Sequence, residues 1–302
     1  ARRLRRLPGL RALGLADNDL EDDAAEQVET FLGLPGLASL DLSHNRLGAA
    51  CGAALCRGLR SLGSLQVLRL EGNLDLSACP NFGRALAGAL GRARRQGGAK
   101  RLWSLDVTLR DSRYEGCGKY FQAVFEGCPC QGHSKTAPKP KCEFCRRQWN
   151  PLPPDDGAPP MNAHRFLATL NSEDGAFPGL RHLGLRHAWL SPRTARALAR
   201  RLTGAPGLTS LDLQDAFLGS AGAQELAATL NSPGQCLTSL NLTRNGIACA
   251  GAAALAEAIA LACPGTLTRL NLTLNDVGAA GARALADALP SAARAGGGVL
   301  AR

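Results

Sequence analysis

The stretch LTSLNLTRNGIACAGAAALAEAIALACPGTLTRLNLTLNDV, residues 237–277, decides the fold of this chain. It holds two copies of the pattern Leu-x-x-Leu-x-Leu-x-x-Asn, one beginning at Leu237 and the other at Leu267. The Leu-x-Leu alternation predicts a short strand with one buried face. Between the copies, residues 250–262 have the apolar spacing of a helix that buries one side. Each unit is therefore expected to be one strand followed by one helix.

The same pattern recurs along most of the chain. Further copies begin at Leu10, Leu37, Leu65, Leu102, Leu180 and Leu208. Successive starts lie 27–30 residues apart, except for 37 residues before Leu102 and 78 residues after it. The weaker copies replace the Asn, by Arg110 in one and by Ala188 in another. A unit of this size cannot bury its apolar face alone, so the units are expected to stack into a solenoid.

A period of 28–29 residues with a helix in every unit resembles the ribonuclease-inhibitor-like class of leucine-rich repeats. The resemblance covers residues 1–110 and 161–290. It implies an α/β fold, a right-handed leucine-rich-repeat solenoid of about eight or more repeats, with a parallel sheet on the concave side and helices on the convex side. It also implies an intracellular interaction surface, because ribonuclease inhibitor, NLR sensors, RanGAP-type proteins and actin regulators share the class.

The long gap after Leu102 predicts an insertion in the solenoid. We divide the chain into N-terminal repeats (1–110), a Cys/Pro/Lys-rich insertion (111–160), C-terminal repeats (161–290) and a flexible tail (291–302). Pro290 is expected to end the last helix, because proline lacks the backbone N–H that a helix interior requires.

The insertion contains the pattern Cys-x-Cys-x2-His-x8-Cys-x2-Cys. Two close cysteine pairs suit a tetrahedral zinc site, and the bound metal would supply the energy to order a loop poor in apolar residues. The predicted ligands are Cys128, Cys130, Cys142 and Cys145, with His133 and Cys117 as alternates. A solvated loop with reduced thiols and a redox-active cysteine pair remain open alternatives.

Charge and aromatic residues also concentrate around the insertion. Residues 92–147 hold thirteen basic and five acidic side chains, a net charge of +8, whereas the whole chain carries +10. Aromatic and arginine side chains dominate interface hot spots, and the same mixture is typical of RNA binding. The partner-binding candidates here are Tyr120, Phe121, Arg146, Arg147 and Trp149. A local core built from these aromatics is the alternative.

Side chains between the buried leucines of each strand alternate onto the concave face. This face is small and polar and has no aromatic residue among its strand positions. Arg186 and Arg269 are its partner-binding candidates, and a face of ordinary solvated strand residues is the alternative. His182 and His187 have no carboxylate or thiol beside them in the sequence, so we expect them to be ordinary surface residues.

The sequence favours a non-catalytic scaffold. It has no Walker loop, nucleophile elbow or HExxH motif. No apolar run reaches the length of a membrane-spanning helix, and eleven cysteines, an odd number, favour a reducing intracellular compartment over a secreted disulfide framework. We therefore expect a subunit of a larger intracellular assembly, axonemal or organellar for example, located in the cytoplasm, a cilium or an organelle. An RNA-contacting subunit and the sensor part of an NLR-like receptor are the alternatives.

Overall fold

The computed structural model describes residues 9–61, 64–73, 76, 79, 81–95, 102–108, 166, 179–188, 190, 192–203, 207–230, 236–261 and 267–296. These residues form one parallel sheet of eight strands in the order β1 to β8, so each strand pairs with the next one in sequence. The strands are β1 (Ala12–Gly14), β2 (Ser39–Asp41), β3 (Val67–Leu70), β4 (Ser104–Val107), β5 (His182–Gly184), β6 (Ser210–Asp212), β7 (Ser239–Asn241) and β8 (Arg269–Asn271). The predicted α/β leucine-rich-repeat solenoid is confirmed.

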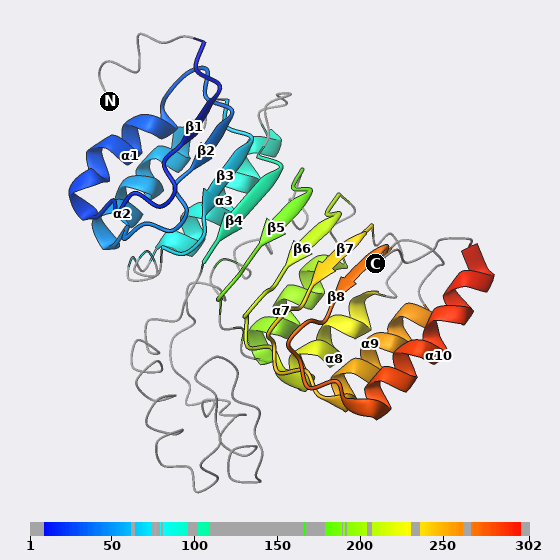
Figure 1. The fold of residues 1–302 in the computed structure, drawn as a ribbon. Helices are drawn as coiled ribbons and strands as arrows, with labels where there is room; N and C mark the ends of the chain where they lie inside the picture. The colour runs from blue at the N-terminus through cyan, green and yellow to red at the C-terminus, as the bar shows by residue number, and fades with distance from the viewer. Residues whose placement is uncertain are drawn as a thin grey trace, which may run out of the picture.

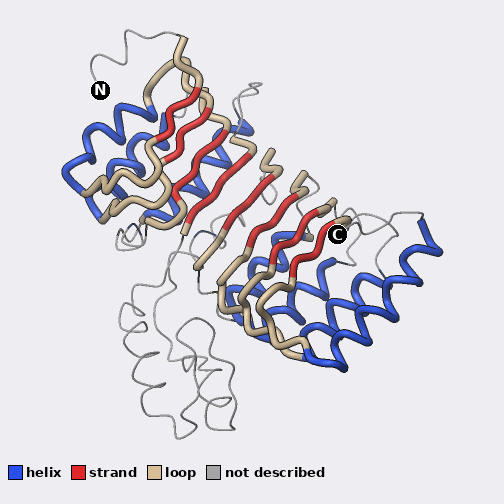
Figure 2. The backbone as a smooth tube through the Cα atoms, in the orientation of Figure 1, coloured by secondary structure: helices blue, strands red, loops and turns tan. Residues whose placement is uncertain are grey.

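The helices follow the strands and gather on one side of the sheet (Figure 1). They are α1 (Ala25–Leu32), α2 (Ala49–Gly58), α3 (Phe82–Arg95), α7 (Pro192–Leu202), α8 (Gly219–Leu230), α9 (Cys249–Leu261) and α10 (Gly278–Gly296), with short 3-10 turns at Asp22–Ala24 and Leu59–Ser61. Helices of consecutive repeats pack against each other, as α8 does on α9 and α9 on α10. No described helix covers the other side of the sheet, which is the concave face (Figure 2).

The core is a column of leucines at the central position of every strand. The register pairs Leu13 with Leu40 and continues without slippage to Leu270. The members of this column in β2 to β7 are at most 1% exposed. Because successive strand residues face opposite sides, burying this column places the flanking residues on the concave face. The β4–β5 pair keeps this register although Leu105 and Leu183 are far apart in the sequence.

The repeat asparagines satisfy the backbone where each strand ends. The Oδ1 of Asn245 accepts the N–H groups of Ala216 and Leu218 in the preceding repeat, at 3.1 and 3.2 Å. Its Nδ2 donates to the carbonyls of Leu213 and Thr243, at 2.8 and 3.2 Å. Equivalent bonds are made by Asn45, Asn73 and Asn275. This ladder confirms that the Asn position has a structural role.

The residue before the asparagine position takes a left-handed backbone conformation. These residues, with φ between 52° and 76°, are Asp17, His44, Gly72, His187, Asp215, Arg244 and Leu274. A positive φ is uncommon outside glycine, yet it recurs here because the chain must turn sharply out of each strand. At Gly72 a Cβ would also collide with the His44 ring, so this position favours glycine for its small size as well as for its backbone conformation.

One predicted boundary is wrong. Helix α10 does not end at Pro290 but continues to Gly296, so residues 291–296 of the expected tail are helical. A proline removes only one backbone donor, and a helix can continue past it with a local bend.

Candidate interaction surface

The concave face carries a polar network in two branches, each of which links side chains from neighbouring strands. In its first branch Arg69 of β3 lies 3.5 Å from Asp41 and 3.6 Å from Asp106. His182 Nε2 lies 2.7 Å from Asp106 Oδ1, and His182 Nδ1 lies 3.0 Å from the Ser210 hydroxyl. This branch therefore links five consecutive strands, β2 to β6.

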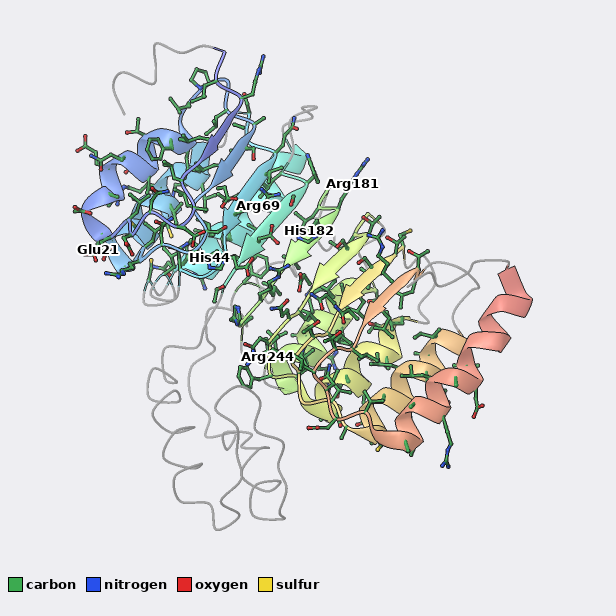
Figure 3. The ribbon with its side chains drawn as sticks, viewed as in Figure 1. Glu21, His44, Arg69, Arg181, His182 and Arg244 are labelled. Atoms are coloured by element: carbon green, nitrogen blue, oxygen red, sulfur yellow. The ribbon has the colours of Figure 1, made fainter. Side chains whose placement is uncertain are left out.

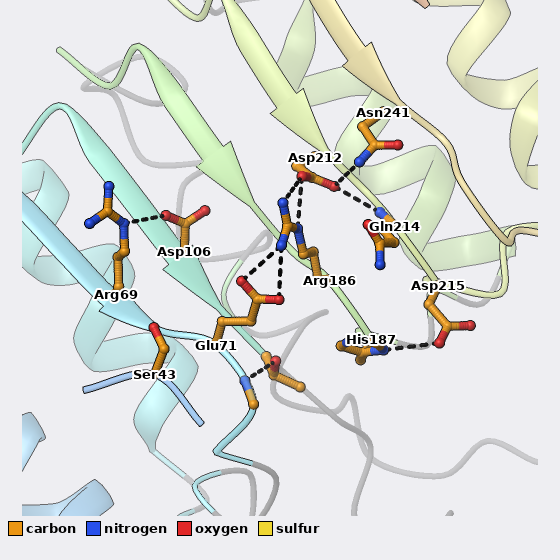
Figure 4. Close-up of polar contacts among 12 residues, drawn as sticks. Ser43, Arg69, Glu71, Asp106, Arg186, His187, Asp212, Gln214, Asp215 and Asn241 are labelled. Atoms are coloured by element: carbon orange, nitrogen blue, oxygen red, sulfur yellow. Dashed lines mark hydrogen bonds and ion pairs between the residues drawn. The ribbon is translucent and has the colours of Figure 1, made fainter. Parts of the chain in front are cut away.

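The second branch centres on Arg186 (Figure 4). Its guanidinium group donates to Asp212 at 2.8 Å and to both carboxylate oxygens of Glu71 at 3.1 and 3.2 Å. Asp212 in turn accepts a hydrogen bond from Asn241 at 3.0 Å. Partial burial opposes the charge on Arg186, but Asp212 and Glu71 outweigh burial and raise its pKa above the ordinary value. Arg186 is therefore a fixed cation, and it reaches from β5 across β4 to the end of β3.

Gly184 makes the first branch possible. It pairs with Asp106 in the β4–β5 register, and a Cβ at this position would collide with the Asp106 carboxylate. Because Gly184 has no side chain, the Asp106 carboxylate can lie over β5 and reach His182. A larger residue at position 184 would block this contact.

Both histidines have carboxylate partners, so the expectation that they are ordinary surface residues is wrong. His182 pairs with Asp106, and His187 Nδ1 lies 3.1 Å from Asp215. The partners come from neighbouring repeats, and so they are not adjacent to the histidines in the sequence. A search at intervals of one repeat would have found Asp215, which lies 28 residues from His187.

Asp106, His182 and Ser210 reproduce the carboxylate–imidazole–hydroxyl order of a hydrolase triad. Acyl transfer also requires N–H donors aimed at the developing oxyanion. The nearby N–H groups of Thr209 and Ser210 both donate to the Arg181 carbonyl, each at 2.9 Å. Those of Thr238 and Ser239 donate to Thr209. These four N–H groups are therefore used within the sheet and do not form an oxyanion hole beside the trio.

An exposed aromatic side chain lies just before one of the central strands. Trp103 immediately precedes β4 and is 42% exposed. Its carbonyl accepts the N–H of Arg181, which precedes β5, so the two exposed residues are neighbours across the sheet. Figure 3 shows Arg181 at the start of β5, where its side chain extends beyond the strand. The concave strands lack aromatics as predicted, but an exposed tryptophan borders them.

The structure describes two of the predicted site residues. Arg186 lies at the centre of the network, whereas Arg269 is exposed at the start of β8 and belongs to a different part of the face. The other candidates lie outside the described residues: Cys117, Tyr120, Phe121, Cys128, Cys130, His133, Cys142, Cys145, Arg146, Arg147 and Trp149. In the described part of the chain, no three His, Cys, Asp or Glu side chains are grouped to hold a metal ion. No helix found there is both long and apolar enough to cross a bilayer.

Comparison with known proteins agrees with this architecture. The family model described as Leucine Rich repeat matches residues 235–256 and 266–286, so the chain contains leucine-rich repeats. It is similar to the Tonsoku-like protein of Bos taurus, with 31% identity over 245 residues. The alignment covers 78% of this chain but 16% of that relative, so the chain spans a small part of the relative's length. Solenoids of this kind generally mediate protein–protein interactions, and they use their extended concave surfaces to do so.

Proposed function

We propose that the chain is a non-catalytic scaffold that binds other proteins of a larger intracellular assembly through its concave face. The observation that carries this proposal is the network around Arg186, which fixes side chains from β3 to β7 in one arrangement before any partner arrives. A preorganised surface loses less side-chain entropy on binding, so it binds better than a mobile surface of the same composition.

The burial of the network supports a binding role over a purely internal one. The carboxylates of Glu71 and Asp212 are 14% and 10% exposed, whereas the Arg186 side chain that pairs with both is 36% exposed. In the other branch, Arg69 is 48% exposed and its partner Asp106 is 14% exposed. A partner would therefore meet guanidinium groups that are already held in place.

The proposal is tested by comparing one bulky substitution on each side of the solenoid. Ser239→Arg obstructs the concave face at β7, whereas Ala253→Arg places the same side chain on the exposed side of α9. We expect Ser239→Arg to release the chain from a high-mass complex in size-exclusion chromatography of cell extracts. Ala253→Arg should leave the complex intact. A wild-type chain that elutes alone, or equal behaviour of both variants, would contradict the proposal.

RNA contact through residues 111–160 remains a prediction from sequence, and so does membership of an NLR-like receptor. The described concave face does not favour RNA, because its cations Arg69 and Arg186 are already paired with carboxylates. Ribonuclease treatment of the complex before size-exclusion chromatography separates the two proposals. It should break up a complex held together by RNA and leave intact one held by protein contacts on the concave face.

A further inference from the structure

The residues just before the strands form a band that we name the strand-start rim. It consists of Arg11, Ala38, Gln66, Trp103, Arg181, Thr209, Thr238 and Thr268, one residue from each of the eight repeats. The next residue of each repeat, the first of its strand, completes the band on the concave side, and Arg269 is that residue in β8.

The rim differs in charge from the rest of the concave face. The cations of this band are Arg11 and Arg181 of the rim and Arg269, the first residue of β8. No residue of the rim and no first residue of a strand is a carboxylate. Among the described residues, Arg181 and Arg269 have no ion-pair partner, whereas Arg69 and Arg186 each have two. The carboxylates begin further along the strands, where arginine or histidine already neutralises them. The rim therefore offers unpaired positive charge beside a neutralised surface.

Trp103 gives this band a point of apolar contact. Tryptophan and arginine are the side chains most enriched in binding hot spots, and here they are adjacent and exposed on β4 and β5. The three threonines that precede β6, β7 and β8 already form hydrogen bonds within the sheet. The hydroxyl groups of Thr209, Thr238 and Thr268 donate to carbonyls of the preceding repeat at 2.9–3.1 Å. Specific recognition on the rim must therefore come from Trp103 and the arginines.

We propose that the strand-start rim binds an extended acidic segment of a partner protein, with one aromatic or large aliphatic residue on Trp103 and carboxylates on Arg181 and Arg269. This inference rests on the proposed function and names the chemistry of the partner. Neighbouring strands are about 4.8 Å apart, so Arg269 on β8 lies about 14 Å from Arg181 on β5 along the sheet. An extended peptide covers that distance in about four residues. The expected order is an apolar residue, an acid about two positions later and a second acid about four positions after the first.

Charge spacing favours a peptide over a nucleic acid. Nucleic-acid binding requires a dense row of cations to neutralise successive phosphates. The rim and the first strand residues together have three cations spread over eight strands, too few to neutralise successive phosphates.

The test uses the full chain and a fluorescein-labelled peptide of sequence GSFSDSGSDSG, in which the two acids follow the phenylalanine by about two and six positions. We expect saturable binding by fluorescence anisotropy. Trp103→Ala and Arg181→Glu should each weaken it at least about tenfold, as expected for hot-spot residues. The matched controls are Phe217→Ala, which removes an aromatic of similar exposure (39%) at the other end of the strands, and Arg283→Glu on α10. Both controls should bind as the wild type does.

The position of the second acid gives a second readout. A peptide whose second acid stands three positions closer to the first should bind the wild type more weakly than the original peptide does. It should not bind Arg269→Glu more weakly, because that variant has no arginine for the second acid to contact. Trp103→Phe and Arg181→Lys, which keep the aromatic ring and the charge, should retain most of the affinity.

Three results would overturn the inference. One is the absence of saturable binding, and another is equal loss in the rim variants and the controls. The third is tighter binding of a twenty-nucleotide oligothymidine to the same rim, which would assign the rim to nucleic acid. If the peptide fails while Ser239→Arg still releases the chain from its complex, the scaffold function stands and the rim proposal alone is wrong.

Discussion

Asn245 shows how one residue holds two repeats together. Its side chain is buried (2% exposed) and hydrogen-bonds to backbone groups of its own repeat and of the preceding one. Asn245→Ala would leave buried N–H and C=O groups without partners, each at a cost of about 1–3 kcal/mol. We therefore expect a loss of at least about 2 kcal/mol in the free energy of unfolding, measured by urea denaturation.

The control for this prediction is Asn271→Ala, which makes the same chemical change at an exposed concave position. It should cost much less than Asn245→Ala. Equal costs for the two variants would show that the asparagine ladder does not support the fold.

The cysteines of the repeats differ in reactivity. Cys51 is fully buried, and burial together with the nearby Asp22 carboxylate raises the pKa of its thiol to about 12. Cys249 is exposed at the start of α9. Because the thiolate is the reactive form, iodoacetamide at pH 8 should alkylate Cys249 well before Cys51 in the native protein, as followed by peptide mass spectrometry. Comparable rates would mean that Cys51 is not buried in solution.

At the scale of the elements, helix α2 is capped by the repeat before it. Asp22 accepts the N–H groups of Gly48, Ala50 and Cys51 at 2.9, 3.2 and 2.9 Å. Burial alone would raise the pKa of Asp22, but these three hydrogen bonds lower it below its ordinary value of 3.8. The cap therefore joins two neighbouring units as well as starting a helix.

Asp22→Ala should destabilise the protein by about 1 kcal/mol at neutral pH. A lowered pKa contributes stability above the ordinary carboxyl value and loses it as the pH falls through the lowered value. The difference between wild type and variant, measured by thermal unfolding, should therefore be constant from pH 7 to pH 5 and shrink below pH 3.8. Asp23→Ala, one residue along, is the control; an equal effect there would contradict a capping role.

At the scale of the molecule, the network joins the two blocks of repeats across the long gap in the pattern. The residues 109–178 separate β4 from the β5 repeat, and Asp106–His182 and Glu71–Arg186 are contacts between side chains 76 and 115 residues apart. Arg186→Ala should accelerate amide hydrogen exchange in β4 and β5 about tenfold, because it removes charge-assisted bonds to β3 and β6.

Arg69→Ala is the matched control for Arg186→Ala. Arg69 is more exposed and its ion pairs are longer, at 3.5 and 3.6 Å, so the effect on exchange should be smaller. If exchange in β4 and β5 does not change in the Arg186 variant, the backbone pairing alone holds the two blocks together.

The zinc prediction also concerns the whole chain. Elemental analysis of the purified protein should find one zinc per chain, and replacing Cys142 and Cys145 by alanine should remove it. The variant should lose protease resistance within residues 111–160 while its far-UV circular dichroism keeps the helical signal of the repeats. A metal-free wild-type chain would remove the basis for a zinc lobe.

The first and last repeats that the structure describes are less well buried than those between them. Leu10, Leu13 and Leu15 in the first, like Leu270 and Leu272 in the last, are only partly buried. A repeat gains its core from the neighbours that stack on both of its sides, and among the described residues each of these two repeats packs against one neighbour.

The sequence by itself determined the strand positions and the leucine column. Each of these depends on local periodicity and on stacking between adjacent repeats. The periodicity and the repeat length can both be read directly from the sequence. The asparagine ladder follows from the same regularity, because its partners lie about one repeat away.

Only the tertiary structure decided which concave side chains meet. Alternation predicted that Asp106, His182 and Arg186 face the same side, but their contacts depend on the β4–β5 pairing and on the space left by Gly184. Trp103 and Arg181 likewise became neighbours through that pairing. Sheet pairing brings together residues that are far apart in the chain, and no local pattern specifies the geometry of their side chains. For this reason the solenoid could be predicted from the sequence, whereas the arrangement of the surface that we expect to bind a partner could be seen only in the structure.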